Sequence, residues 1–359
     1  MTGGDGFLGW HTQCALRESG ATIDDMPVGG FFDELQAAGA LSGADRLIYL
    51  AGVMRGSDDE ITNGNAQFAQ QVADLVHRVD EPPKTIVFAN STQASCDTVY
   101  GRAKARAAVV LRDAAEAVGA DFVDVHLPNM FGEHGRPFYN TVTSTFCHVL
   151  AGGGHPTVEA DEELTLLHAQ NAADVLIGRR SPDDLPDMAV HESVSGLLRR
   201  LTMIAETYGH GEIPDIGTEF DRDLFNTYRS YVVGSGNVIS LHRQRDERGR
   251  VAGLLRSHGG TGQSSFSTTR PGVVRGNNFH RRQVERFVVV SGQARISLRR
   301  LLTGAAVSVD VDGDRPTAVD MPTMWAHNIR NTGSKSLVTF YWTDDLFENG
   351  LPDTISEQV

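Results

Sequence analysis

The sequence has few cysteines, little positive charge and no long apolar run. Its cysteines, Cys14, Cys96 and Cys147, are scattered and none forms a C-x-x-C pair, which fits a reduced cytoplasm better than a disulfide framework. The formal net charge of -14 argues against a binder of nucleic acid or anionic membranes, because both require clustered Lys and Arg. No stretch resembles a membrane span or a signal peptide. We therefore expect a cytoplasmic protein with neither nucleic acid nor membrane as a partner.

The opening stretch MTGGDGFLGW lacks a preceding strand. Its spacing is that of a turn in which glycines let dinucleotide phosphates approach the backbone at the start of a helix, and such a turn normally follows a buried strand. The motif residues are Thr2, Gly3, Gly6, Phe7 and Gly9. A flexible glycine-rich end is the alternative. We expect a phosphate-binding turn without its first strand, and hypothesise that Met1 is not the natural start: a GTG valine codon at the end of that strand, read as an initiator, would give this N-terminus.

The length and a change of texture near residue 236 predict two domains, residues 1–235 and 236–359. The first alternates short apolar runs with amphipathic ones, which predicts an α/β fold with a doubly wound parallel sheet. The predicted strands are 46–50, 85–89 and 122–126, with a short one within Ala21–Met26, and the predicted helices are 68–78 and 101–118.

The second domain is rich in Gly, Ser, Thr and Val, and its short alternating runs predict an antiparallel sandwich or barrel. The clearest runs are 286–291, 294–298 and 337–341, and the junction is expected in 221–237.

Tyr100 and Lys104 stand at the start of the second predicted helix, four residues apart, which places them on one helix face. A phenol has a pKa of about 10, so it exchanges protons near neutral pH only if a nearby cation favours its ionised form. Lys104 can supply that cation. A surface Tyr and a surface Lys are the alternative.

Ser91 and Thr92 directly follow the strand TIVFA. Ligands of doubly wound sheets bind beyond the carboxyl ends of the strands, so a hydroxyl there can orient a substrate carbonyl beside the tyrosine. A simple turn is the alternative.

Together these motifs resemble the extended short-chain dehydrogenase/reductase family that acts on nucleotide sugars, whose first domain is a Rossmann fold that binds NADP or NAD. The resemblance implies that Ser91, Tyr100 and Lys104 are the catalytic triad. It implies cofactor contacts from Thr2, Gly3, Gly6, Phe7, Gly9, Leu50, Ala51, Gly52, Asn65, Tyr100 and Lys104, and substrate contacts from Thr92, His126 and Asn129. His126 stands where such relatives usually carry Arg. Asp24 or Asp25 could bond a ribose diol and favour NAD, but the sequence leaves NAD and NADP open.

The second domain contains GNNFHRRQVE, then Gly292, and later PTMWAHNIRN, which resemble the paired motifs of cupins. His280, Glu285 and His327 fall on the ligand positions, while Asn278 replaces the first histidine and Met324 a glycine. Two imidazoles and a carboxylate suit a divalent metal, and zinc is our first expectation, with Asn278 as the weaker fourth ligand. A core histidine, or a metal-free site in which His280 is a general base, is the alternative.

The combination of both halves resembles a bifunctional capsular polysaccharide biosynthesis family that forms UDP-2-acetamido-2,6-dideoxy-L-talose on the route to N-acetyl-L-fucosamine. The resemblance implies that the cupin epimerises a UDP-linked 4-keto amino sugar at carbon 3, that the reductase domain reduces carbon 4 with NAD(P)H, and that the protein is a homodimer. Two alternatives stay open: a monofunctional reductase with a degenerate, structural cupin, and a catalytically silent binder of sugar nucleotides.

Overall fold

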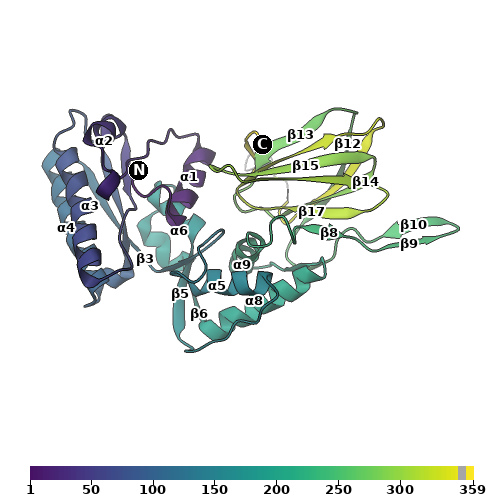
Figure 1. Cartoon of the computed structure of the whole chain (residues 1–359), viewed down its shortest axis with the longest axis horizontal. Helices are drawn as coiled ribbons and strands as arrows, with labels where there is room; N and C mark the ends of the chain where they lie inside the picture. Colours follow the sequence, from purple (N-terminus) through teal and green to yellow (C-terminus); the bar gives the residue numbers. More distant parts are fainter. Residues whose placement is uncertain (347–352) are drawn as a thin grey trace. The chain divides into compact units, whose positions relative to one another are not determined.

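The structure is a computed structural model and describes residues 1–346 and 353–359 (Figure 1). It divides into two compact units. Unit 1 comprises Met1–Met130 and Leu164–His191, and unit 2 comprises Phe131–Glu163 and Glu192–Val359. The boundary predicted near residue 235 lies inside unit 2, because it follows a change of composition and not of packing. The functional division of the chain stays a prediction.

Unit 1 is built on a parallel sheet of order β1-β2-β3, with Arg46–Tyr49, Thr85–Ser91 and Asp121–Leu127 as its strands. These are the three predicted apolar runs, and the prediction of a parallel sheet is confirmed. Buried strands of this kind read as nearly continuous apolar sequence because both faces are covered.

Helices cover both faces of this sheet, as Figure 1 shows for α3 and α4 on one side and α1 and α6 on the other. Leu47, Ile86 and Phe88 pack against α3 and α4, whereas Ile48 and Val87 pack toward α6. The doubly wound arrangement is therefore confirmed. The helices of unit 1 are α1 (Phe7–Ser19), α2 (Glu34–Leu41), α3 (Asp58–Val76), α4 (Val99–Val118), α6 (Ala169–Leu176) and α7 (Leu185–Met188), with short 3-10 turns η1 (Gly29–Phe31), η2 (Thr92–Ser95) and η3 (Pro182–Asp184).

Two predictions for unit 1 were wrong. Ala21–Met26 forms no strand, although its Met26 N–H donates to the Met1 carbonyl at 2.8 Å. The helix predicted from residue 68 begins ten residues earlier, because Ser57 and Glu60 form a capping box that starts α3.

The position next to β1 is taken by the first residues of the chain. Thr2 forms an isolated parallel bridge with Tyr49, and its N–H donates to the Ile48 carbonyl at 3.0 Å. The glycine turn thus starts beside the free edge of β1, where a preceding strand was expected.

Unit 2 contains two five-stranded sheets, of orders β12-β19-β14-β17-β8 and β16-β15-β18-β13-β20. Their strands are β8 (Val238–Ser240), β12 (Gln263–Thr269), β13 (Val274–Phe279), β14 (Glu285–Ser291), β15 (Gln293–Arg300), β16 (Ala306–Asp312), β17 (Thr317–Met321), β18 (Trp325–Asn331), β19 (Leu337–Thr343) and β20 (Ile355–Ser356). All pairings are antiparallel, and Val289 and Val319 of one sheet share a core with Ile296 and Ile329 of the other. The prediction of an antiparallel β domain, a sandwich or barrel, is confirmed in the form of two packed sheets.

The remaining elements are short or join these sheets. They are β4 (Asn129–Phe131), β5 (Glu163–His168) and β6 (Val190–Ser193), which form one sheet, the pairs β7 (Ile213–Asp215) with β11 (Ser257–Gly259) and β9 (Arg243–Asp246) with β10 (Gly249–Ala252), and helices α5 (Val142–Ala151), α8 (Val194–Gly209) and α9 (Glu219–Arg229). No described helix is long and apolar enough to cross a membrane.

The predicted junction is largely helix α9, which is anchored to the sandwich by buried polar groups. Arg229, 2% exposed, donates to the Met321 carbonyl at 3.0 Å, and Asn226 donates to the Arg282 carbonyl at 2.8 Å. A neighbouring pair, Arg286 and Asp320, is buried and joined by two hydrogen bonds of 2.6 and 2.9 Å. This helix therefore belongs to the packing of unit 2 and is not a linker.

Candidate active sites

The glycine turn has the geometry that a close backbone approach requires. Gly3 adopts a left-handed conformation, with φ of 67°, which favours glycine. A Cβ on Gly9 would lie 2.1 Å from the Gly3 carbonyl oxygen, so no other residue fits where α1 meets the turn. Gly6 caps α1 without any side-chain bond. The first N–H groups of α1 therefore have no side-chain acceptor at the cap, which is the arrangement that binds phosphate.

Thr2 joins this turn to the loop that follows β1. Its hydroxyl oxygen accepts the N–H groups of Leu50 and Ala51, at 3.0 and 3.1 Å. Gly3 packs on the same loop, since a Cβ there would lie 3.0 Å from the Ala51 nitrogen. The two motifs assigned to the cofactor are thus held together by one buried threonine.

Asn65, buried in α3, holds the next part of that loop. Its amide donates to the carbonyls of Val53 and Ile61, at 2.8 and 2.7 Å, and its oxygen accepts the Val53 N–H at 3.3 Å. A Cβ on Gly52 would lie 3.0 Å from that oxygen. Asn65 therefore shapes the loop around Gly52, and its structure-forming role explains why an amide is needed in the middle of a helix.

The three predicted catalytic side chains come from β2 and α4. Ser91 ends β2 and its hydroxyl accepts the Gln93 N–H at 3.2 Å, while Tyr100 and Lys104 lie in the first two turns of α4. Within the described part of the chain, no hydrogen bond joins these three side chains to one another. Burial raises the pKa of Tyr100 above its usual value, which further disfavours the phenolate at neutral pH.

Lys104 is the most unusual charge in unit 1. It is 4% exposed, donates to the Ala89 carbonyl at 2.7 Å, and lies 4.1 Å above the Phe88 ring. Burial lowers its pKa to about 7, although the charge of Asp124 acts in the opposite direction. A buried lysine of this kind has given up hydration, as functional lysines do.

A polar network behind the strand ends supports Ser91. Asn90 accepts the Ser91 N–H at 2.8 Å and donates to Asp124 of β3 at 2.8 Å, and His126 Nε2 lies 3.2 Å from the same carboxylate. Sequence reasoning missed Asn90 and Asp124. A charged residue inside the apolar run FVDV was the available signal for Asp124.

The residues assigned to the substrate lie at the same strand ends. Thr92 begins the turn η2 after β2, and His126 and Asn129 flank the end of β3; all three are exposed. Asp25, also exposed, lies beside the glycine turn, since a Cβ on Gly4 would be 2.8 Å from its carboxylate.

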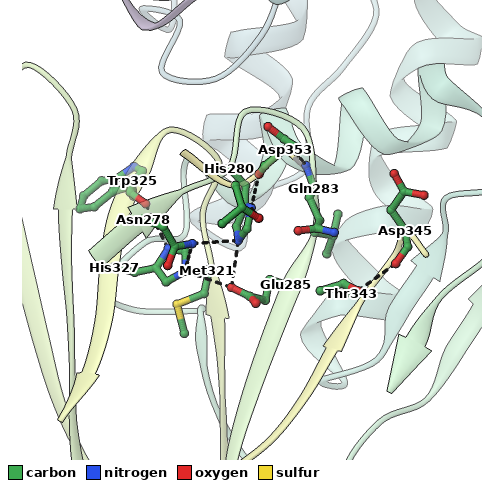
Figure 2. A network of polar contacts seen from close by, with 12 residues as sticks. Asn278, His280, Gln283, Glu285, Met321, Trp325, His327, Thr343, Asp345 and Asp353 are labelled. Carbon is green, nitrogen blue, oxygen red and sulfur yellow. Dashed lines mark hydrogen bonds and ion pairs between the residues drawn. The ribbon is translucent and has the colours of Figure 1, made fainter. Parts of the chain in front are cut away.

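In unit 2 the predicted metal ligands converge. His280 follows β13, Glu285 begins β14 and His327 lies in β18, and their ligand atoms all lie within 4.8 Å of one another. Figure 2 shows both imidazoles directed at Glu285, whose Oε2 atom is 3.2 Å from His280 Nε2 and 3.0 Å from His327 Nε2. Asn278 pairs with His327 across the strands and places its amide 3.4 Å from each Nε2 atom.

The electrostatics of this cluster depend on its burial. Burial alone would lower the pKa of His280, but the Glu285 carboxylate raises it to about 9. Burial would raise the pKa of Glu285, whereas the two imidazoles lower it far more strongly. Both shifts favour a carboxylate on Glu285 and a proton on His280. Metal binding at Nε2 requires that proton to leave.

The other ring nitrogen of each histidine faces a backbone carbonyl. His280 Nδ1 bonds to the Asp353 carbonyl, and His327 Nδ1 lies 3.2 Å from the Trp325 carbonyl. A carbonyl only accepts, so each Nδ1 carries a proton, and a neutral ring then presents its Nε2 lone pair to the cluster. Two imidazoles so oriented and a carboxylate fit a divalent metal such as zinc.

Met324 shows why a glycine is expected in the second motif. Its φ of 58° is left-handed, a conformation that costs a side chain about 1–2 kcal/mol. The Met324 side chain is fully buried and its N–H donates to the His280 carbonyl at 2.7 Å. The turn is therefore retained without glycine, and it ties the two motifs together.

Comparison with known proteins gives matches to both parts of the chain. Residues 244–355 match the model of the polysaccharide biosynthesis C-terminal domain. The whole chain is 28% identical over 373 residues to UDP-2-acetamido-2,6-beta-L-arabino-hexul-4-ose reductase of Pseudomonas aeruginosa, covering 98% of that protein. A shorter stretch is 27% identical over 125 residues, 32% of this chain and 83% of the relative, to spore coat polysaccharide biosynthesis protein SpsL of Bacillus subtilis.

Among solved structures, the capsular polysaccharide assembling protein CapF of Staphylococcus aureus matches with a TM-score of 0.62 and 28% identity over 100% of this chain and 99% of that one. Over its full length the chain therefore resembles a UDP-sugar reductase and a capsular polysaccharide assembling protein, and over residues 244–355 it matches a domain of polysaccharide biosynthesis.

Proposed function

We propose that the chain is a bifunctional enzyme of nucleotide-sugar modification, in which unit 2 epimerises a UDP-linked 4-keto-6-deoxy amino sugar at carbon 3 and the α/β unit reduces the 4-keto group with NAD(P)H. The observation that carries the proposal is the full-length similarity to a reductase whose name specifies a UDP-linked hexul-4-ose. The product proposed is the L-talose derivative of the N-acetyl-L-fucosamine route, and the protein is proposed to act as a cytoplasmic homodimer.

Reduction needs a proton donor beside the oxygen that receives charge. A bound nicotinamide cofactor would supply hydride to carbon 4. Tyr100, whose pKa burial raises, would give its phenolic proton to the substrate oxygen. Lys104, four residues along the same helix, stabilises the phenolate that remains. Ser91 lies at the end of β2, where its hydroxyl orients the substrate carbonyl. General acid catalysis of this kind contributes about 10²–10⁴-fold in rate.

The cofactor contacts follow from the glycine turn. The N–H groups at the N-terminus of α1 would hold the pyrophosphate of the cofactor, because these groups and the helix dipole favour negative charge. Asp25, beside Gly4, is placed to accept bonds from a ribose diol, which favours NAD over NADP in this proposal.

Epimerisation at carbon 3 starts from a proton made acidic by the neighbouring carbonyl. A divalent metal held by His280, Glu285, His327 and Asn278 would supply Lewis-acid stabilisation of the negative charge on the carbonyl oxygen. In the metal-free protein a protonated His280 would donate a hydrogen bond to that oxygen.

The reductase half is tested with a panel of UDP- and dTDP-linked 4-keto sugars, each with NADH and NADPH, and with product identification by mass spectrometry. We expect turnover with a UDP-linked substrate and a loss of about 10²–10⁴-fold in kcat for Tyr100→Phe, with cofactor affinity retained. A chain that binds sugar nucleotides but transfers no hydride to any of them would be a binder, and the proposal would be wrong.

The epimerase half is tested by solvent deuterium exchange into the 4-keto sugar without a reduced cofactor. We expect one deuterium at carbon 3, lost in His280→Asn. Asn278 and Met324 depart from the motif and favour a second candidate, a monofunctional reductase with a structural cupin. Reduction without any exchange would establish that candidate.

A further inference from the structure

A turn in unit 2 is organised around one carboxylate that no motif assigns. The Asp353 side chain accepts the N–H groups of three successive residues, Arg281 at 2.8 Å, Arg282 at 2.6 Å and Gln283 at 2.8 Å. These residues form the loop that joins β13 to β14, with His280 at its start and Glu285 at its end. Bonds from backbone N–H groups to a carboxylate are charge-assisted and stronger than neutral ones.

The same residue also contacts the ring of His280 through its backbone. Its carbonyl accepts the His280 Nδ1 proton, and the Thr354 hydroxyl lies 3.5 Å from that nitrogen. Figure 2 shows the His280 ring between Asp353 on one side and Glu285 on the other. One residue therefore fixes both the backbone of the loop and the orientation of the ring.

Downstream of Asp353, the chain continues as an edge strand of the sandwich. Asn278 pairs with Ser356 and Phe279 with Ile355, and the Glu357 carboxylate accepts from Arg299 at 2.8 Å. This pairing gives Asp353 a fixed position on its C-terminal side. It also offers a comparison variant at Glu357, because that carboxylate belongs to the same segment and bonds to Arg299 of β15.

We propose that Asp353 is a positioning residue that holds the His280 ring with Nδ1 protonated and Nε2 directed at Glu285, so that the cluster is preorganised to bind a divalent metal. The metal in this inference rests on the proposed function, whereas the orientation of the His280 ring can be tested in the metal-free protein. Carbonyl groups bonded to the far nitrogen of a ligating histidine fix its tautomer and orientation, and losing such a partner typically costs 10–100-fold in metal affinity.

The first test is NMR of the ring N–H protons in the metal-free protein. We expect a His280 Nδ1 proton that exchanges slowly with solvent, assigned by its absence in His280→Gln. In Asp353→Ala this proton should exchange at least about tenfold faster, because the loop N–H groups lose their acceptor and the carbonyl is no longer held against the ring. Glu357→Gln should leave it slow. A slow proton that persists in Asp353→Ala, or none in the wild type, overturns the proposal.

The second test is zinc affinity by chelator competition, with the Co²⁺ absorption spectrum as a report on ligand geometry. We expect an affinity about 10–100-fold weaker in Asp353→Ala, an intermediate loss in Asp353→Asn, which keeps one acceptor oxygen, and a wild-type value in Glu357→Gln. Equal losses in Asp353→Ala and Glu357→Gln would show a general effect of loosening the segment and refute a specific role. A wild type that binds no metal contradicts the proposed metal site, and the NMR result then decides the role of Asp353 by itself.

Discussion

Replacing Lys104 by methionine should change how the stability of unit 1 depends on pH. Lys104 has a pKa of about 7 in the folded chain because it is buried, whereas an unfolded lysine has a pKa of about 10.4. Between these values the unfolded chain binds more protons than the folded one, so stability rises with pH across that window. Below pH 7 the lysine is charged in both states and its desolvation cost is constant and greatest. Methionine keeps the apolar stem and removes the charge.

The size of the expected change in stability depends on how much of the interval between the folded and unfolded pKa values of Lys104 the measured pH range covers. One pH unit inside the window corresponds to about 1.4 kcal/mol, and going from pH 6 to pH 8 crosses about one such unit. From pH 6 to pH 8 the free energy of unfolding of the wild type should therefore rise by about 1 kcal/mol relative to that of Lys104→Met. For a unit of this size that is about 2–4 °C in the melting temperature.

Differential scanning calorimetry at pH 6 and pH 8 measures this difference, and subtracting the two proteins cancels every other titrating group. The methionine also leaves the Ala89 carbonyl without its 2.7 Å donor, which lowers stability equally at both pH values. Lys84→Met is the matched control, because Lys84 is exposed, with 81% of its side chain accessible, and should show no pH dependence in this range. If the difference between wild type and Lys104→Met is the same at pH 6 and pH 8, the lysine is not desolvated as described.

Three further predictions concern packing, buried charge and ligation. Gly9→Ala should abolish cofactor binding and lower the free energy of unfolding by about 1–3 kcal/mol, because the added Cβ would collide with the glycine turn. Gly39→Ala is the control, since a Cβ there meets open space in α2 and the change should be neutral or stabilising. Cofactor titration and thermal melts measure both effects, and equal behaviour of the two variants would contradict the prediction. Asp320→Asn should cost about 3–5 kcal/mol in chemical unfolding, because Arg286 is left buried without its counter-charge, and a cost below about 1 kcal/mol would speak against this. Asn278→His should bind zinc more tightly, on the order of tenfold, since imidazole is a better ligand than an amide, and unchanged affinity in chelator competition would exclude Asn278 from the ligand set.

The sequence predicted which segments form strands and helices better than it predicted the residue at which each one begins. The three apolar runs of unit 1 and the alternating runs of unit 2 became strands because burial on one or both faces leaves a direct pattern in the sequence. The start of α3 was missed although Ser57 and Glu60 carry the capping signal. A strand within Ala21–Met26 was wrong, because a short apolar stretch specifies no pairing partner.

The candidate sites show the same division. The resemblance to cupin motifs, which carry ligands at fixed intervals, was enough to select His280, Glu285 and His327. The structure brings the side-chain atoms of these three residues together. Spacing also put Tyr100 and Lys104 on one helix, but it gave no indication that Lys104 is buried against Ala89 and Phe88. Burial depends on what the rest of the chain packs over a side chain.

By itself, the sequence determined which residue types stand at which intervals: the glycine turn, the tyrosine and lysine of one helix, the histidines and the carboxylate of the sandwich. Only the tertiary structure decided that Thr2 ties the turn to the loop after β1, that Asn90 and Asp124 support Ser91, and that Asp353 holds the loop beside His280. The physical reason is that these contacts join residues far apart in the chain. Thr2 and Asp353 bond to backbone N–H groups, which are the same at every position and leave no mark in the sequence, and the Asn90–Asp124 bond forms only because β2 and β3 are neighbours in the sheet.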